Sequence, residues 1–123
     1  MAEKVISFTQ LEVWKQSHTL VIDIYKSCEN IRYNHVVRNQ IERSALSISS
    51  NISEGFGRDS IKDKTHFYIM ARGSLYELQN QLLVMRDLSL IDQITFKKIA
   101  DKSSDVQRLL HGLIRSTRKK ASS

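Results

Sequence analysis

The clearest structural pattern of this chain lies in FKKIADKSSDVQRLLHGL, residues 96–113. Small or apolar side chains recur there at alternating steps of three and four residues: Phe96, Ile99, Ser103, Val106, Leu110 and Leu113. Because an α-helix has about 3.6 residues per turn, this spacing places them in one stripe along a helix. Such a stripe favours antiparallel packing at about 20° to neighbouring helices. The pattern predicts a helix over about residues 92–118.

Two earlier segments share this spacing and predict helices over about residues 36–54 and 60–87. The apolar line of the helix over residues 36–54 consists of Ile41, Ala45, Ile48 and Ile52. The second begins with the capping sequence Ser60-Ile61-Lys62-Asp63, and its apolar residues are Phe67, Met70, Ala71, Leu75, Leu78, Leu82 and Met85. Gly55 is the expected C-terminal stop of the helix over residues 36–54. Because no strand precedes Gly55-Phe56-Gly57, this G-x-G favours a tight turn over a phosphate loop.

A first helix is predicted over about residues 9–30. Thr9-Gln10-Leu11-Glu12 has the spacing of a capping box, which satisfies free amide donors at a helix start. The apolar stripe of this helix is expected to consist of Leu11, Trp14, His18, Val21, Tyr25 and Cys28. The polar residues 30–34 then form the first connection.

Four amphipathic segments with short connections predict one fold class, an all-α, antiparallel up-down-up-down four-helix bundle. The chain has no proline and four glycines, so the main helix breakers are rare. We expect a single domain over residues 1–123. No stretch approaches the ~18 apolar residues of a membrane span, and the start resembles no secretory signal. These features predict a cytoplasmic protein.

The net charge of +6 is concentrated at one end of the chain. Residues 97–123 hold eight Lys or Arg against two Asp, whereas residues 1–96 hold eleven bases and eleven acids. Bases near a helix C-terminus are stabilised by the helix dipole, so a solvated basic tail is one interpretation. Attraction of a nucleic acid is the other. Membrane binding is disfavoured because the bundle needs the apolar face of this helix.

A polar line runs along the predicted second helix, away from its apolar line: Arg43, Ser47, Asn51 and Glu54. On the third helix, Gly73 and Ser74 are small enough to allow close approach, and Glu77 follows one turn later. These residues form either a hydrogen-bonded network that fixes the register of the two helices or an interface with another copy or partner.

Several of these segments resemble the four-helix bundle proteins encoded within intervening sequences of bacterial 23S ribosomal RNA genes. QIERSALSISSNISEG, residues 40–55, is similar to the family pattern Q-x-x-R-A-x-x-S-I-P-S-N-I-A-E-G. ARGSLYEL, residues 71–78, resembles A-x-G-S-x-x-E-L, and LEVW, residues 11–14, resembles L-x-V-W. The chain departs from the family at Ser49 and Ser53, and near Tyr33, where a proline is common. The resemblance implies a bacterial homo-oligomer, a pentamer, with nucleic acid as partner.

The sequence predicts no catalytic site, no cofactor and no metal centre. Di-metal bundles need paired Glu-x-x-His motifs, and Asp63-Lys64-Thr65-His66 is the one spacing here that is comparable. His18 is expected at the core or its boundary, and His111 lies among bases without an acidic partner. Cys28, the single cysteine, forms no intramolecular disulfide and is expected to be a buried apolar side chain.

Two functions remain open. The first is a non-enzymatic, oligomeric scaffold that binds RNA or DNA through Arg108, Arg115, Arg118, Lys119 and Lys120, with a second basic surface at Arg43, Arg58, Lys62 and Arg72. The second is a protein-interaction adaptor without nucleic-acid contact, whose site comprises residues 51–57 and the Gly73-Ser74 face.

Overall fold

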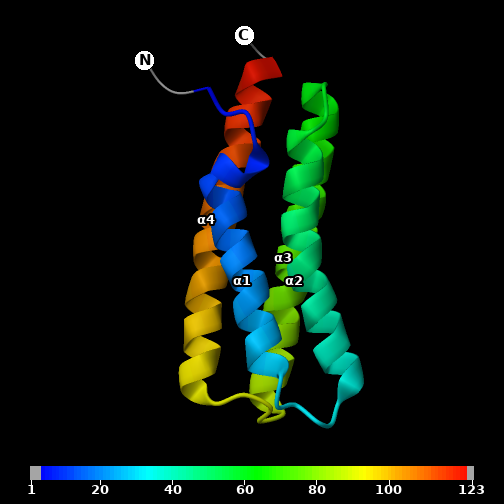
Figure 1. Ribbon diagram of the computed structural model, residues 1–123, viewed down its shortest axis with the longest axis vertical. Coiled ribbons are helices and arrows are strands. Elements are labelled where there is room, and N and C mark those ends of the chain that lie inside the picture. Colours follow the sequence, from blue (N-terminus) through cyan, green and yellow to red (C-terminus); the bar gives the residue numbers. More distant parts are fainter. Residues whose placement is uncertain (1–3, 122–123) are drawn as a thin grey trace.

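The structure, a computed structural model, describes residues 4–121 and consists of four long helices. A short 3-10 helix, η1 (Phe8–Gln10), precedes α1 (Glu12–Cys28), α2 (His35–Phe56), α3 (Ile61–Asp87) and α4 (Gln93–Ala121). Successive helices run in opposite directions, and the first and last described residues lie at the same end (Figure 1). The described residues contain no strand. The predicted all-α, up-down-up-down bundle is therefore confirmed, whereas the single-domain organisation stays a prediction.

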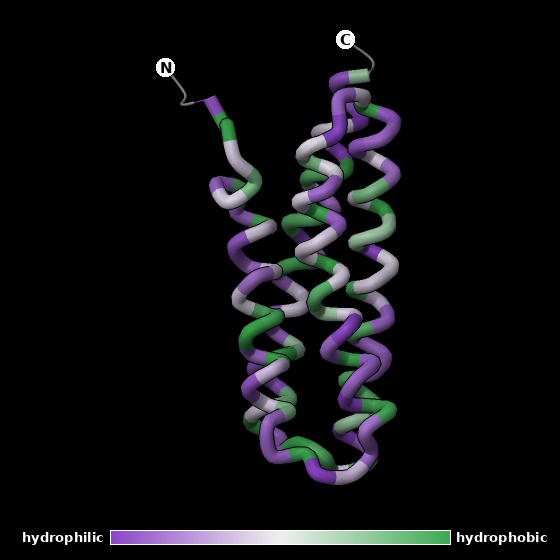
Figure 2. Tube along the Cα trace, turned by 45° about the vertical axis from the view of Figure 1, so that its right-hand side comes forward, coloured by the Kyte–Doolittle hydropathy of each residue, from purple (hydrophilic) through white to green (hydrophobic). Residues whose placement is uncertain are grey.

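Each helix packs against two others around one hydrophobic core. α1 contacts α2 and α4, α3 contacts the same two helices, and the α2–α3 interface is the most extensive. Figure 2 shows hydrophobic and hydrophilic residues alternating along each helix, as amphipathic helices require. The predicted line on α2 is fully buried: Ile41, Ala45, Ile48 and Ile52. On α4, Ile99, Ser103, Val106 and Leu110 are buried as predicted.

The start of α1 differs from the prediction. The capping box is formed by Ser7 and Gln10: Ser7 Oγ accepts from the Thr9 amide at 3.2 Å, and Gln10 Oε1 accepts from the Ser7 amide at 3.0 Å. It caps η1, while α1 begins at Glu12 after an extended Leu11 that provides no side-chain cap. The predicted capping box at Thr9 is therefore wrong.

The predicted stripe on α1 is partly wrong as well. Cys28 and Val21 are buried, but His18 and Tyr25 are exposed. The core instead takes Val13, Ser17, Leu20 and Ile24. This helix carries apolar residues on more than half of its circumference. Its sequence is therefore compatible with two stripes of the same period, and either could face the core.

The end of α2 is a second correction. Gly55 is buried inside the helix, which ends at Phe56 with Gly57 as C-cap. A Cβ built on Gly55 would lie 2.7 Å from Cε1 of Tyr68, so the glycine allows the Tyr68 ring to pack against the α2 backbone. Gly55 is therefore a packing residue, and it does not stop the helix.

The helix starts at α3 and α4 are capped by side chains. Ser60 Oγ accepts from the Asp63 amide at 3.0 Å, which confirms the predicted start of α3. Asp92 Oδ1 accepts from the Thr95 amide at 2.7 Å, and this hydrogen bond lowers the pKa of Asp92. Met70 is 44 % exposed, so its predicted place in the core is wrong, and Tyr68 is buried there instead.

Candidate nucleic-acid interface

Basic side chains of α3 and α4 converge on the outer side of these two helices. Arg72 of α3 lines a hollow of about 440 Å³ together with residues of α4: His111, Ile114, Arg115, Arg118 and Lys119. A second hollow of about 450 Å³ is lined by Ser104, Gln107, Arg108, His111 and Arg115. We call the set Arg72, Arg108, His111, Arg115, Arg118 and Lys119 the α3–α4 basic surface. His111 and Arg115 belong to both hollows, so the two are adjacent.

The α4 side of this surface follows from helical spacing. Arg108, His111, Arg115 and Arg118 recur at steps of three and four, so they project from one side of the helix. The side turned away from these bases carries Val106 and Leu110, which are buried in the core, and Ile114 lies at the border, buried but also lining the first hollow. The core therefore fixes the direction in which these bases point.

The α3–α4 basic surface is not neutralised by nearby acids. No carboxylate lines either hollow. The ion pairs within residues 4–121 involve other bases, namely Arg38, Arg58, Arg86 and Lys97. Like charges gathered without counter-charges attract anions, and the attraction weakens as salt rises.

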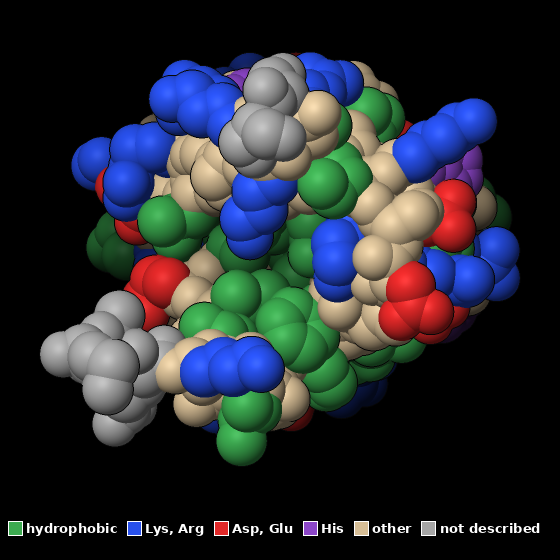
Figure 3. All heavy atoms as spheres, turned by 90° about the horizontal axis from the view of Figure 1, so that it is seen from above, with side chains coloured by type: hydrophobic (Ala, Val, Ile, Leu, Met, Phe, Trp, Pro, Cys, Tyr) green, Lys and Arg blue, Asp and Glu red, His purple; other side chains and the backbone are tan. Residues whose placement is uncertain are grey.

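Lys120 lies apart from the other predicted bases. It lines a different hollow, of about 420 Å³, at the end of the bundle, where the apolar residues are Val5, Leu11, Phe56, Ile61, Tyr68 and Leu113. Seen from this end, hydrophobic side chains form the floor of the hollow and Lys or Arg side chains stand around it (Figure 3). On its wall, Lys64 Nζ donates to the Phe56 carbonyl at 2.6 Å, and burial raises the pKa of Tyr68.

Two of the four residues predicted as a second basic surface, Arg72 and Arg58, line different hollows. Arg72 lines a hollow together with bases of α4, as described above. Arg58 pairs with Glu54 at 2.5 Å and lies over the Phe67 ring at 4.6 Å from its centroid. The hollow beside Arg58 is also lined by Glu54, Asp59 and Asp63, so carboxylates outnumber bases there.

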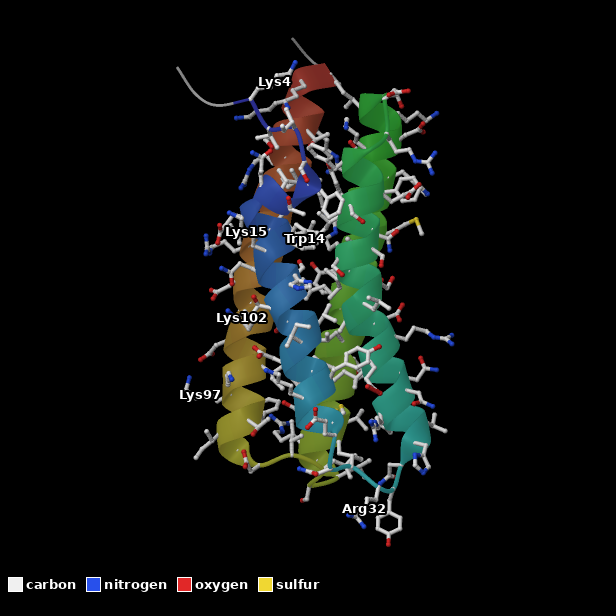
Figure 4. The ribbon with its side chains drawn as sticks, viewed as in Figure 1. Lys4, Trp14, Lys15, Arg32, Lys97 and Lys102 are labelled. Atoms are coloured by element: carbon white, nitrogen blue, oxygen red, sulfur yellow. The ribbon has the colours of Figure 1, made fainter. Side chains whose placement is uncertain are left out.

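Lysines elsewhere line the other side of α4. Lys15, Lys97 and Lys102 lie along the side formed by α1 and α4, and Trp14 points toward α2 (Figure 4). Lys102 Nζ donates to Gln16 Oε1 at 3.0 Å, and Lys97 pairs with Asp101 at 3.0 Å. Both lysines are therefore engaged in contacts within the bundle.

The predicted polar line on α2 divides into two parts. Ser47 Oγ lies 2.8 Å from Ser74 Oγ, and Asn51 Nδ2 donates to the Ser47 carbonyl at 2.9 Å and to Ser47 Oγ at 3.1 Å. We call Ser47, Asn51 and Ser74 the α2–α3 polar seam. Arg43, Glu54, Gly73 and Glu77 are exposed and lie outside it. A Cβ at Gly73 would meet no atom within 4 Å.

His18 and His66 pack against aromatic rings, and Cys28 is buried. His18 stacks on Trp14 with 4.8 Å between ring centroids, and His66 makes an edge contact with Phe67. Burial raises the pKa of the Cys28 thiol to about 11, so the thiol stays protonated and unreactive at neutral pH. Within residues 4–121, no group of three or more His, Cys, Asp or Glu is placed to hold a metal ion.

Two residues of the interface were missed by the sequence reasoning as binding residues. His111 lines both hollows, and Tyr76 reaches it from α3, with 3.3 Å between the Tyr76 hydroxyl and His111 Nε2. Tyr76 lies one turn after Arg72 on α3, and His111 one turn before Arg115 on α4. This i, i+4 spacing of a base with an aromatic or imidazole ring was the available signal.

The fold and its surface define a class: a helical bundle with a packed α2–α3 interface and a basic α3–α4 surface. Residues 9–112 match the family of 23S rRNA-intervening sequence proteins, and the chain belongs to this family. The resemblance noted from residues 11–14, 40–55 and 71–78 is thereby confirmed. None of the curated protein sequences matches the chain.

A solved structure agrees with the assignment. It is that of a protein of unknown function from the S23 ribosomal protein family of Bacteroides thetaiotaomicron VPI-5482. The two chains are 26% identical with a TM-score of 0.78, and the match covers 83% of this chain and 97% of the other.

No helix among residues 4–121 is long and apolar enough to cross a membrane.

Proposed function

We propose that this chain is a non-enzymatic scaffold that binds RNA or DNA through the α3–α4 basic surface. The observation that carries the proposal is the convergence of Arg72, Arg115, Arg118 and Lys119 on one hollow without a lining carboxylate. Several donors around one concave site suit phosphate oxygens, because arginine presents a planar fork to them. The binding is electrostatic and contacts the backbone, so it depends steeply on salt and weakly on sequence.

Assembly strengthens this proposal. The family resemblance implies a homo-oligomer, a pentamer, and we keep that state as part of the proposal, together with a cytoplasmic location. Each copy would then present one basic surface to the same strand. Linked sites convert later contacts into intramolecular ones, so modest single-site affinities combine into tight binding.

A protein-interaction adaptor is the second candidate function, and the open space around Gly73 favours it. Gly73 is bordered by Met70, which is 44 % exposed, and Leu46 is 50 % exposed on the neighbouring helix. A bare glycine on an exposed helix side allows a helix of another chain to approach closely. Binding there would leave the α3–α4 basic surface unchanged, so the two functions can be separated by mutation.

The test compares two variants that each lose three positive charges. One replaces Arg72, Arg115 and Arg118 by Ala, and the matched control replaces Arg43, Arg58 and Lys62 by Ala. Binding of labelled RNA and DNA is measured over a range of salt concentrations. The slope of log affinity against log salt is negative. We expect it to become less steep by about two to three in the first variant, because up to three phosphate contacts are lost.

The control decides whether location or total charge matters. It should keep the wild-type salt slope and most of the affinity. Equal losses in both variants would mean that the net charge acts without a defined surface. Absence of binding by the wild-type protein even at low salt would remove nucleic-acid binding and leave the adaptor function.

A further inference from the structure

We infer that the α3–α4 basic surface selects single strands over duplexes, with one base stacked on the ring of Tyr76. This inference rests on the proposed function and names its substrate class. It starts from a side chain that the electrostatic argument does not use. Tyr76 is 46 % exposed, although tyrosine carries an apolar ring that is stabilised by burial.

The ring of Tyr76 is held beside the basic hollows. Its hydroxyl lies 3.3 Å from Nε2 of His111, and His111 lines both hollows. Arg72, one turn earlier on α3, lines the hollow of about 440 Å³ from the same helix. An exposed aromatic ring therefore lies next to arginines that are free of carboxylate partners within residues 4–121.

A positively charged groove combined with an aromatic platform is the usual arrangement for unpaired nucleic acid. Phosphates bind to the bases of the groove, and an unpaired base stacks on the ring. Stacking needs no particular base because every base has a π-face, which agrees with weak sequence preference. The hollow of Ser104 and Gln107, beside Arg108, offers polar groups for the next nucleotide.

A duplex cannot use Tyr76 in this way. Its bases are paired and stacked on one another, so a side chain must extrude a base before it can contact a face. A duplex therefore reaches only the outward-pointing cations, such as Arg108 and Arg115. The affinity for single strands should include a contribution from the ring, and the affinity for duplexes should not.

The experiment uses oligonucleotides that differ only in their bases. Fluorescence anisotropy measures wild-type protein binding to a labelled adenine strand of about 15 nucleotides, to an abasic strand of the same length and charge, and to the blunt duplex. RNA and DNA versions of the adenine strand distinguish the two sources of the same chemistry. We expect the adenine strand to bind roughly five- to a hundredfold more tightly than the abasic strand.

Two substitutions locate the preference. Tyr76→Leu should abolish the difference between adenine and abasic strands while leaving duplex binding unchanged. Tyr76→Phe keeps the ring and loses the hydroxyl, so it should keep the preference. Circular dichroism of both variants checks that the bundle is folded, and a preference lost equally in both variants would assign the effect to the His111 contact and overturn stacking.

The outcomes separate the inference from the proposed function. If no strand or duplex binds at low salt, the proposed function fails. If adenine and abasic strands bind equally, if the duplex binds as tightly as the adenine strand, or if Tyr76→Leu keeps the preference, the inference fails and electrostatic binding stands. A preference that disappears in Tyr76→Leu and survives in Tyr76→Phe supports it.

Discussion

The two sides of α3 differ in what they contact. Toward α2, α3 forms the most extensive helix interface of the bundle, with small and neutral side chains such as Ser47 and Ser74 in direct hydrogen-bond contact. Toward α4, its outer edge carries Arg72 and Tyr76 beside the bases of α4. The first side stabilises the bundle, and the second gathers charge that folding does not require. Under the proposed function, one helix serves stability and binding through different sides.

Deletion of core volume on α3 should have the largest effect on stability. Leu78 is fully buried, so Leu78→Ala should lower the free energy of unfolding by about 2–5 kcal/mol through lost burial and the cavity left behind. Leu83→Ala on the same helix is the control, because Leu83 is 43 % exposed and should cost well under half as much. Urea unfolding measures both, and equal losses would contradict the core placement.

The close contact between α2 and α3 at Gly55 predicts the next largest effect. Gly55→Ala places a methyl group 2.7 Å from a Tyr68 ring carbon and 3.1 Å from Phe67 Cβ, so either the Tyr68 ring or the two helices must shift. We expect a loss of about 1–3 kcal/mol in the free energy of unfolding.

Gly57→Ala is the matched control for Gly55→Ala. Its new Cβ would lie 3.6 Å or more from the nearest atoms, in ordinary contact, and its φ of −77° suits any residue. Thermal unfolding of both variants should show a lower midpoint for Gly55→Ala alone. A similar midpoint in both would mean that the Tyr68 ring moves away without cost.

The α2–α3 polar seam predicts a smaller, pairwise effect. The variants Ser47→Ala, Ser74→Ala and the double variant form a mutant cycle around the 2.8 Å contact between the two hydroxyls. A half-buried hydrogen bond between neutral groups should give a coupling of about 0.5–1.5 kcal/mol. Additive losses would show that Ser47 is held by Asn51 alone, and the register would then depend on apolar packing.

Much of this comparison could be predicted from the sequence. The line of Ile41, Ala45, Ile48 and Ile52 on α2 is unambiguous because polar residues surround it, and all four are buried. The stripe on α1 is ambiguous. Val13, Leu20 and Ile24 recur with the same period as Trp14 and Tyr25, so either set could face the core. Periodicity gives the number of helices and their type, but a helix with apolar residues on most sides does not reveal its orientation.

The site was harder to predict for a different reason. Composition identifies the bases of α4, but the sequence places Arg72 with Arg58 and Lys62, which precede it by 14 and 10 residues. Its place beside Arg115 depends on how α3 and α4 are aligned lengthwise, and no local pattern determines that alignment. Gly55 shows the same limit, because a glycine at a helix end and a glycine under an aromatic ring look identical in sequence.

The smallest effect should come from Gly73, and its sign is opposite to that of Gly55. Gly73→Ala adds a methyl group into open space on an exposed helix, so it should raise the free energy of unfolding by about 0.5–1 kcal/mol, the difference in helix propensity. Urea unfolding checks the value for the single chain.

The larger Gly73→Leu variant then asks what the open space is for. A Cβ at this position meets no atom within 4 Å, so the helix content by circular dichroism should not change. If a helix of another copy approaches the backbone at Gly73, the leucine blocks it, and light scattering should report a smaller particle. An unchanged particle mass would mean that the bare backbone at Gly73 is not a contact between copies.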